Sequence, residues 1–336
     1  MPKVELHVHL EGSADVDTLL ELAAGNRIDL PRDRIEEARR PRSYASFDHF
    51  AKAFLMTVHC IRRLDDFALL VHRHGAAMHR QNIRYAEVTW TPQLYGHLRL
   101  PLDDILEALN AGRSRARRDW GVEMRWIPDL VRSFPGPALR VQAWAASNRA
   151  RDGGVVALGL GGPEAEGLHP DIRQAFARAR AAGLPANPHA GEGAGPASVR
   201  AALHDLAAVR IGHGVRAVED PGLVSYLAEH QVPLEVCPTS NILLGIFGNY
   251  ADHPLKRLLA AGCRVTVNSD DPALFGSGLS SEYRHAVASC GLSLPQLKST
   301  VMAAVSAAYL PESEKHAMAR AFHAELVRLE VEVEAT

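Results

Sequence analysis

The amino-acid sequence predicts an α/β fold in which eight parallel strands close into a (β/α)8 TIM barrel. Short runs rich in Val and Ile alternate with helix-length segments along the chain. This alternation is typical of βαβ units in a parallel sheet. Eight such units in 336 residues favour a closed barrel, because barrels of this kind need about 250 residues.

The candidate strands are short and apolar. In chain order they are Val4–His9, Arg84–Thr89, Met124–Pro128, Val155–Leu160, Pro185–His189, Arg210–His213, Pro233–Cys237 and Arg264–Asn268. An open doubly wound sheet is the alternative fold. That fold calls for a Gly-rich phosphate-binding turn after the first strand, and Leu10-Glu11-Gly12-Ser13 is not such a turn. We therefore interpret residues 1–336 as one metal-dependent hydrolase barrel domain.

Extra helices are expected between the first two strands and at the C-terminus. Residues 10–83 form the longest connection, and Phe47, Phe50 and Phe54 within it share one face of a predicted helix. This helix either packs on the barrel or forms a lid that excludes water from the site. Residues 311–334 are predicted to form an amphipathic helix around the barrel, and the charge-rich residues 32–42 a solvated surface segment.

Composition and charge exclude several classes of function. The chain is 47% hydrophobic and 23% charged, as is usual for soluble globular proteins. A net charge of −2 gives no reason to expect a nucleic-acid or membrane-surface partner. Without a signal segment or a long apolar run, the chain is predicted to be cytoplasmic. The composition does not indicate an oligomeric state.

The cysteine pattern argues against a thiolate metal site. The four cysteines contain no CxxC pair, so both a thiolate zinc site and a disulfide framework are disfavoured. We expect buried free thiols at these positions, which are Cys60, Cys237, Cys263 and Cys290.

Polar clusters stand at the carboxyl ends of the predicted strands, where barrel enzymes build their active sites. His7 and His9 are two residues apart in the first strand, so their rings face the same side. Two buried imidazoles without partners would be costly, and a shared zinc ion would satisfy both. Further clusters, residues 187–192, 211–214 and 268–272, follow the fifth, sixth and eighth strands. Together they offer the ligands and acid–base groups of a catalytic zinc site.

On these motifs the sequence resembles the adenosine deaminase family of amidohydrolase-type barrels. The motifs occur in the family's order and span nearly the whole chain. They are His7-Val8-His9-Leu10-Glu11-Gly12, His189-Ala190-Gly191-Glu192, Gly212-His213-Gly214, Cys237-Pro238-Thr239-Ser240-Asn241 and Ser269-Asp270-Asp271-Pro272. The resemblance implies hydrolytic deamination at C6 of an aminopurine nucleoside, giving the 6-oxo purine and ammonia.

The resemblance also implies a role for each site residue. One Zn²⁺ per chain is expected to be held by His7, His9, His189 and Asp270. Glu192 is expected to protonate purine N1, which requires an environment that raises its pKa. His213 is expected to orient the attacking water and to take part in proton transfer. Asp271 is expected to share a hydrogen bond with N7.

Three positions bear on the choice of substrate. Glu11 stands where the family places an acidic residue near the ribose 5′ end, but adenosine-specific members usually have Asp there. Gly162 matches a glycine of nucleoside-type members, whose backbone approaches purine N3. The segment Asp129–Phe134 resembles deaminases of 6-amino-6-deoxyfutalosine, an adenosine-like intermediate of menaquinone synthesis with a 5′ aromatic carboxylate. Adenosine, this 5′-modified adenosine and free adenine are therefore the candidate substrates.

Two other classes of function fit the sequence less well. A related phosphoesterase or lactonase would prefer a two-metal site with a bridging lysine after the fourth strand. None of the five lysines lies there; they are Lys3, Lys52, Lys256, Lys298 and Lys315. A non-catalytic binding protein on this fold would be expected to have lost part of the ligand and acid–base set, which is complete here.

Overall fold

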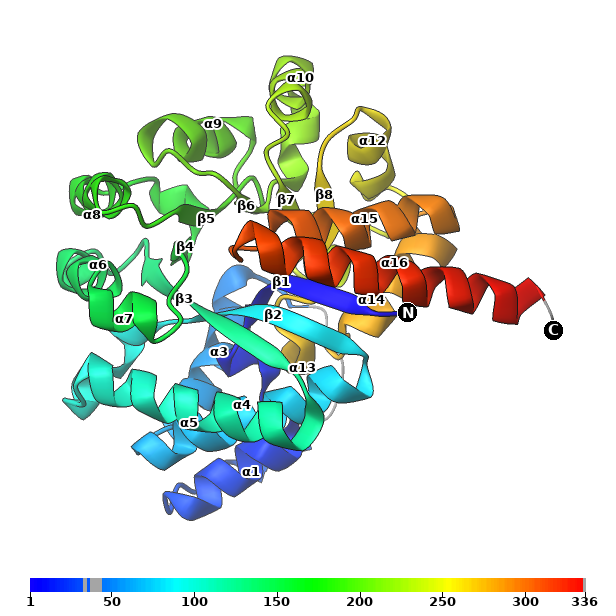
Figure 1. Cartoon of the computed structure of the whole chain (residues 1–336). Coiled ribbons are helices and arrows are strands. Elements are labelled where there is room, and N and C mark those ends of the chain that lie inside the picture. Colours follow the sequence, from blue (N-terminus) through cyan, green and yellow to red (C-terminus); the bar gives the residue numbers. More distant parts are fainter. Residues whose placement is uncertain (33–34, 37–43, 335–336) are drawn as a thin grey trace.

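The computed structural model, which describes residues 1–32, 35–36 and 44–334, has the predicted barrel. Eight strands pair in parallel in the order β1 to β8. They are β1 (Lys3–His9), β2 (Ile83–Trp90), β3 (Glu123–Val131), β4 (Leu158–Gly161), β5 (Ala186–Ala190), β6 (Ile211–His213), β7 (Leu234–Val236) and β8 (Val265–Val267). Helices form a ring outside the strands (Figure 1).

The barrel closes between β8 and β1 through very few contacts. Val8 forms an isolated parallel bridge with Asp270, which follows β8. The His9 N–H donates to the Asp270 carbonyl at 2.8 Å, and the Asp270 N–H donates to the His7 carbonyl at 3.1 Å. Below this bridge the Leu6 N–H donates to the Asn268 side chain at 3.0 Å. This closure between β8 and β1, which we call the seam of the barrel, therefore involves His7, His9 and Asp270, three of the residues predicted to bind a metal.

The fourth strand differs from its prediction. The sequence favoured Val155–Leu160, but the strand is Leu158–Gly161. Val155 forms only an isolated bridge with Trp126, and its N–H donates to the Ala150 carbonyl in the preceding helix. Val155 and Val156 are β-branched and therefore resemble a strand in sequence, but they connect the preceding helix, α7 (Asn148–Asp152), to the barrel.

Helices precede or follow every strand. Between β1 and β2 lie α1 (Val16–Gly25), α3 (Phe47–Cys60) and α4 (Leu64–Arg80). The others are α5 (Leu102–Trp120), α6 (Ala138–Ala145), α7 (Asn148–Asp152), α8 (Pro170–Ala181), α9 (Pro196–Asp205), α10 (Pro221–Glu229), α11 (Pro238–Leu243), α12 (Leu255–Ala260), α13 (Pro272–Phe275), α14 (Leu279–Ala288), α15 (Leu294–Ala307) and α16 (Glu312–Glu334). Short 3₁₀ turns are η1 (Glu11–Ser13), η2 (Pro92–Leu98), η3 (Glu164–Glu166) and η4 (Val215–Glu219).

Helix starts follow from local sequence chemistry. The Asp15 side chain accepts from the Thr18 N–H at the start of α1, and Ser46 accepts from the His49 N–H at the start of α3. Such caps satisfy backbone donors that have no partner within the helix. Ser293 and Gln296 form a reciprocal capping box at α15.

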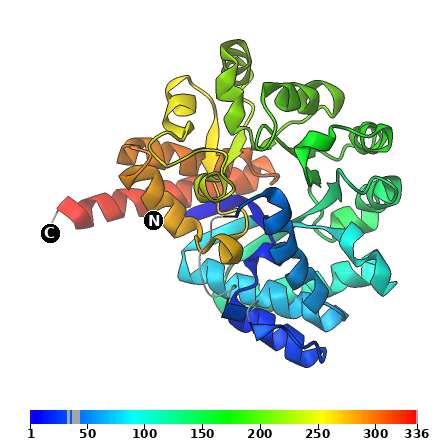
Figure 2. The same ribbon diagram turned by 180° about the vertical axis from the view of Figure 1, so that it is seen from behind.

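Helix α3 lies across the end of the barrel that holds the polar clusters (Figure 2). Phe50 stacks on Phe275 with ring centroids 5.3 Å apart, while Phe47 and Phe54 line the pocket. The helix thus packs on the barrel rim and also covers the site. Its motion as a lid stays a prediction.

The remaining expectations concern the surface and the C-terminus. Helix α16 has the predicted position in sequence and packs on α15. Most of the charge-rich segment 32–42 lies outside the described residues. All four cysteines are buried free thiols, as predicted. Among the helices of the described ranges, none is both long and apolar enough to cross a membrane.

Candidate active site

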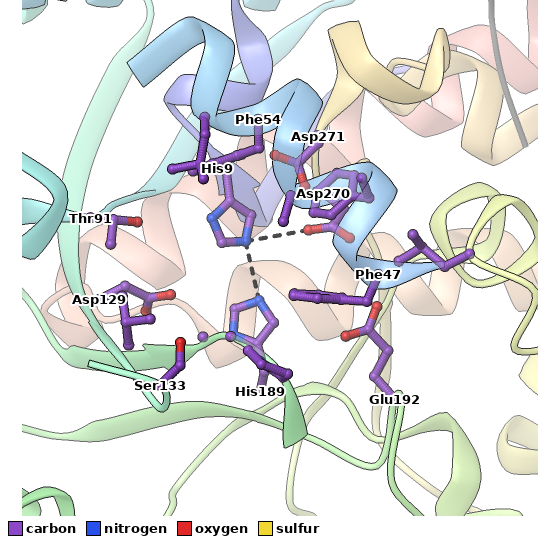
Figure 3. A pocket seen from close by; sticks show the side chains of 18 of the residues that line it. His9, Phe47, Phe54, Thr91, Asp129, Ser133, His189, Glu192, Asp270 and Asp271 are labelled. Atoms are coloured by element: carbon purple, nitrogen blue, oxygen red, sulfur yellow. Dashed lines mark hydrogen bonds and ion pairs between the residues drawn. The ribbon is translucent and has the colours of Figure 1, made fainter. Parts of the chain in front are cut away.

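A cavity of about 340 Å³ opens at the carboxyl ends of the strands, beneath α3 (Figure 3). Its size suits a small molecule. Its polar lining comes from the ends of β1, β3, β5, β6 and β8, and its apolar lining mostly from α3. The polar set includes His9, Asp129, His189, Glu192, His213, Asp270 and Asp271. The motifs that the sequence places at separate strand ends therefore meet in one pocket.

The structure brings the four predicted metal ligands together. One ligand atom from each of His7, His9, His189 and Asp270 lies within 4.8 Å of all the others, and all four residues are buried. His7 Nε2 and His9 Nε2 each lie 3.3 Å from Asp270 Oδ1. His9 Nε2 lies 3.1 Å from His189 Nε2. In a tetrahedral zinc site with bonds of about 2.0–2.1 Å, two ligand atoms lie about 3.3 Å apart.

Outer partners orient the histidine rings towards this cluster. His7 Nδ1 donates to the Glu235 carboxylate at 2.9 Å, and His189 Nδ1 donates to the Leu160 carbonyl at 2.9 Å. Each bond places the ring proton on Nδ1 and leaves the Nε2 lone pair free. His7 Nε2 is also buried without a hydrogen-bond partner. Nitrogen lone pairs that converge at this spacing fit a cation, so the residues present suit a bound metal.

A buried charge network holds Glu235 beneath the cluster. Arg210 forms ion pairs with Glu235 and, at 2.6 Å, with Glu87. Burial pushes the pKa of Glu235 upward, but the Arg210 guanidinium and His7 outweigh it and hold the pKa below its usual range. Glu235 therefore stays ionised as the acceptor for His7.

Two of the site residues adopt a backbone conformation that side chains disfavour. His213 has φ +61° and Asp270 has φ +62°, both in the left-handed region. Such conformations cost about 1–2 kcal/mol for residues other than glycine. The strain turns both side chains into the pocket at the ends of β6 and β8.

Glu192 is buried and faces His213, whose Nε2 lies 3.6 Å from Glu192 Oε1. Burial raises the pKa of Glu192 well above its usual range, and the nearby Asp270 and Glu164 carboxylates raise it further. The expected role of Glu192 as a proton donor requires a protonated carboxyl, and its surroundings favour that state.

Glu164 anchors the loop that carries Glu192. Its Oε1 accepts from the Gly191 N–H at 2.7 Å and from the Ser198 hydroxyl at 2.5 Å. Its Oε2 accepts from the Glu192 N–H at 2.9 Å and the Ala194 N–H at 2.7 Å. One carboxylate from η3 therefore fixes the backbone after β5.

A hydrogen-bond relay fixes the proton of His213. The Leu255 backbone N–H donates to His253 Nδ1 at 3.2 Å, so His253 carries its proton on Nε2 and donates to Asn241 Oδ1 at 3.1 Å. The Asn241 amide then donates to His213 Nδ1 at 3.2 Å. Because burial lowers the pKa of His213 to about 3 despite Asp270, its single proton lies on Nε2 and points into the pocket.

Asp271 lies beside Asp270 but is directed differently. Its Oδ1 is buried without a partner, and a Cβ on Gly12 would lie 1.8 Å from it. Only glycine leaves room for this carboxyl. Burial raises the pKa of Asp271, whereas the close imidazoles of His7 and His9 overcome burial and hold the pKa of Asp270 low.

The remaining sequence candidates occupy different places. Gly162 lines the pocket with φ +87°. Glu11 is fully buried outside the pocket lining, where it accepts from the Thr91 N–H at 3.0 Å and the Tyr95 hydroxyl at 3.1 Å. Arg132 donates to the His189 carbonyl at 2.7 Å, which agrees with a structural role. Glu11 thus supports the loop after β2, and its contact with the substrate stays a prediction.

Sequence reasoning missed the outer residues Glu235, Glu164 and His253. Glu235 has a recognisable signal, because a carboxylate inside a short apolar strand must be paired when buried. Glu164 stands in the short 3₁₀ turn η3 and His253 in a connecting loop, and no sequence pattern predicts their partners. Cys237 also lies within ligand distance of His7, His213 and Asp270; burial raises the pKa of its thiol, which disfavours the thiolate form that binds metals.

Comparison with known protein sequences gives consistent matches. The family model described as adenosine deaminase matches residues 2–324. An aminodeoxyfutalosine deaminase from Streptomyces avermitilis is 40% identical, over 94% of this chain and 88% of that protein. An adenosine deaminase from Klebsiella pneumoniae is 35% identical, over 95% and 96% of the two chains.

Solved structures agree with the sequence matches. An adenine deaminase from Arthrobacter aurescens has a TM-score of 0.88 at 29% identity, and the alignment covers 95% of this chain and 97% of that one. An amidohydrolase from Burkholderia ambifaria, solved with bound Zn, has a TM-score of 0.91 at 26% identity, covering 100% and 93%. The barrel and the whole length of the chain are therefore shared with these deaminases and amidohydrolases.

Proposed function

Because this chain belongs to the adenosine deaminase family, whose members are hydrolases of C–N bonds, we propose that it removes the 6-amino group of an aminopurine nucleoside. The products are the 6-oxo purine nucleoside and ammonia. The observation that carries the proposal is the meeting of the four-residue metal cluster with Glu192, His213 and Asp271 in one buried pocket.

The metal ligands in this proposal are His7, His9, His189 and Asp270, and Zn²⁺ is the ion that their chemistry favours. A zinc ion bound there would make a nucleophilic oxygen available at neutral pH. The zinc-containing Burkholderia amidohydrolase supports this choice of ion. The Nδ1 bonds of His7 and His189 keep their Nε2 atoms available for it.

Side chains of the protein donate the proton to the purine and form the hydrogen bonds that orient the reactants. Glu192, kept protonated by burial and neighbouring carboxylates, donates to ring N1, so that the purine accepts electrons as C6 becomes tetrahedral. His213 presents its Nε2–H to the attacking oxygen and orients it. Its neutral state makes it a hydrogen-bond donor at this stage, with the relay through Asn241 holding that tautomer. Asp271 shares a hydrogen bond with N7.

Among nucleosides, 6-amino-6-deoxyfutalosine is the first candidate and adenosine the second. The 40% identity to the Streptomyces enzyme supports the former. So does the apolar wall of the pocket formed by Phe54, Leu55 and Leu94, which suits an aromatic 5′ group. Free adenine is the third candidate. The polar side chains of Thr91, Asp129 and Ser133, on the side of the pocket opposite Glu192, favour a substrate that carries a sugar.

A deamination screen tests the proposal. The kcat/KM values of the metal-loaded protein would be compared for 6-amino-6-deoxyfutalosine, adenosine, 2′-deoxyadenosine and adenine, with ammonia release as the measurement. We expect both nucleosides with a full ribose to exceed adenine, and 6-amino-6-deoxyfutalosine to exceed adenosine. Equal or higher activity on adenine would overturn the assignment to nucleosides. Activity that survives complete removal of metal by a chelator would overturn the metal-dependent mechanism.

A further inference from the structure

Asp129, at the end of β3, is a buried carboxyl group to which the proposed mechanism gives no task. It lines the pocket and is 2% exposed. Its Oδ1 atom is buried and has no hydrogen-bond partner among the described residues. A buried polar atom without a partner is costly and calls for an explanation. The explanation that a pocket offers is a bound ligand.

No cation nearby accounts for this carboxyl. Arg132 donates through its two Nη atoms to the carbonyls of Gly167 and His189. The imidazoles of His9 and His7, which act more strongly on the pKa of Asp129, belong to the proposed metal ligands. Among the described residues, Asp129 forms no ion pair within 4.0 Å. Asp129 is therefore not the buried half of a structural salt bridge.

The neighbouring strand leaves space for this side chain. A Cβ on Gly159 would lie 1.8 Å from Asp129 Oδ1, and a Cβ on Gly161 would lie 2.7 Å from Oδ2. Both glycines belong to β4, which pairs with β3 through Asp129 and Gly159. A larger residue at either position would displace the carboxyl, so two glycines form a cradle that fits it.

The position of Asp129 in the pocket indicates which part of a ligand it would meet. Figure 3 shows Asp129, Thr91 and Ser133 together on one side, with Glu192 across the pocket beyond His9 and His189. A purine whose C6 lies at the metal cluster, with N1 at Glu192 and N7 at Asp271, directs its sugar away from Glu192. The three polar side chains therefore face the sugar.

We propose that Asp129 determines specificity for ribose by accepting a hydrogen bond from the 2′-hydroxyl of the substrate. The inference rests on the proposed nucleoside deamination. Gly162, the next residue along from the cradle, is expected at purine N3. In nucleic acids N3 and the 2′-hydroxyl face the same groove, so a carboxyl next to the N3 contact lies on the 2′ side. In dinucleotide-binding folds, too, a carboxylate accepts a hydrogen bond from the ribose 2′-hydroxyl.

The discrimination expected from such a contact is large. Burial raises the pKa of Asp129 to about 7, so the carboxyl is partly ionised at neutral pH, and both its ionised and its neutral form offer an oxygen that accepts a hydrogen bond from a hydroxyl. A 2′-deoxy ligand would leave the carboxyl buried and unpaired, and sites built for a hydroxyl reject analogues that lack it. We expect a preference for ribose of about tenfold to a hundredfold.

The test compares inosine, 2′-deoxyinosine and 3′-deoxyinosine as inhibitors of deamination of the best substrate from the screen. For the unaltered protein, the inhibition constant of 2′-deoxyinosine should exceed that of inosine by about tenfold to a hundredfold, with a smaller change for 3′-deoxyinosine. Equal constants for inosine and 2′-deoxyinosine, or a loss confined to 3′-deoxyinosine, would overturn the proposal. If no nucleoside is deaminated, the proposed function itself fails, and direct binding of the same three ligands still decides the role of Asp129.

Variants separate the carboxyl from the rest of the pocket. Asp129→Ala should bring the 2′-deoxyinosine to inosine ratio to within about twofold of one, through weaker binding of inosine. Gly161→Ala keeps the carboxyl but displaces it, and should lower the ratio as well. The control is Asp48→Asn, which neutralises an exposed pocket carboxyl on α3 and should leave the ratio unchanged. If Asp129→Ala does not fold, Asp129→Leu and Gly161→Ala supply the same comparison, because leucine has no atom that accepts a hydrogen bond. A preference for ribose that persists in the folded variants excludes the proposed role.

Discussion

At the scale of single residues, the pocket shifts the pKa values of similar carboxyl groups in opposite directions. The imidazoles of His7 and His9, each 3.3 Å from Asp270 Oδ1, hold the pKa of Asp270 low although burial acts against them. Glu192 is buried among other carboxylates, and its pKa is raised. Environments that push the pKa values of neighbouring acids apart mark the division between a ligand and a proton donor. Sequence alone gives the residue types, and burial gives each one its protonation state.

The first prediction concerns Glu192. Glu192→Gln keeps the size and burial of the side chain but removes the acidic proton. We expect kcat to fall by about 10²–10⁴-fold, the usual contribution of a general acid. Metal content, measured by atomic emission on the purified protein, should match that of the unaltered chain, because Glu192 is not in the ligand set. Turnover within a few-fold of normal would remove Glu192 from the acid role.

At the scale of elements, the site depends on loops that hold one another. The 3₁₀ turn after β4 supplies Glu164, and the loop after β5 supplies the N–H groups that Glu164 accepts, including that of Glu192. The negative charge of Glu164 also raises the pKa of Glu192. Glu164 therefore positions the proposed acid and adds to the effect of burial and of Asp270 on its pKa.

The second prediction follows from this contact. Glu164→Gln replaces one acceptor oxygen by an amide that cannot accept, and two backbone or hydroxyl donors lose their partner. We expect kcat to fall about tenfold to a hundredfold, because each charge-assisted bond contributes about 1.5–3 kcal/mol. The alkaline limb of the pH–rate profile should move to lower pH, because the pKa of Glu192 falls when the negative charge is removed. A lower kcat with an unmoved alkaline limb would assign Glu164 a positional role only.

Helix α4 contains a histidine that should make stability depend on pH. His74 is 4% exposed, and neither ring nitrogen has a hydrogen-bond partner in the described structure. Burial lowers its pKa from 6.5 to about 4. Between these values the unfolded chain binds the proton and the folded chain does not, so the free energy of unfolding falls as pH drops below 6.5.

The third prediction uses His74→Leu, which removes this proton site without removing a hydrogen bond. From pH 7.5 to pH 5 the variant should gain about 2 kcal/mol in unfolding free energy relative to the unaltered protein. Urea unfolding at both pH values measures the difference. His79→Leu, at an exposed position of the same helix, is the control and should show no such gain. A constant difference between His74→Leu and the unaltered protein at both pH values would contradict the argument.

At the scale of the whole molecule, the sequence predicted the barrel and the metal cluster but not the surroundings of the site. Alternating strands and helices determine the fold class, and two-residue spacing places His7 and His9 on one side. The start of β4 was placed too early because Val155 and Val156 have strand-forming side chains in a connecting segment. The cradle of Asp129 depends on glycines of the neighbouring strand. Such contacts between distant segments leave no local pattern in the sequence.

The barrel's seam and the proposed metal site occupy the same part of the molecule. An isolated bridge between Val8 and Asp270 and a few backbone and side-chain hydrogen bonds, including those of Glu5 with Ser269, join β1 to β8 and the segment after it. The proposed ligands come from β1, β5 and the end of β8. A bound ion would therefore connect strands across the seam and across the barrel, and the metal should contribute to global stability as well as to catalysis.

The last prediction is that metal removal weakens the whole fold. A ligand present at about 1,000 times its Kd stabilises the folded state by about 4 kcal/mol. For a chain of this size that corresponds to a Tm lowered by about 5–10 °C after chelation. Calorimetry of the metal-loaded and chelated protein measures the shift, and hydrogen exchange should show the largest gain at β1 and β8. Re-addition of Zn²⁺ should restore the Tm. An unchanged Tm after verified metal loss would mean that the hydrogen bonds across the seam close the barrel without help from the ion.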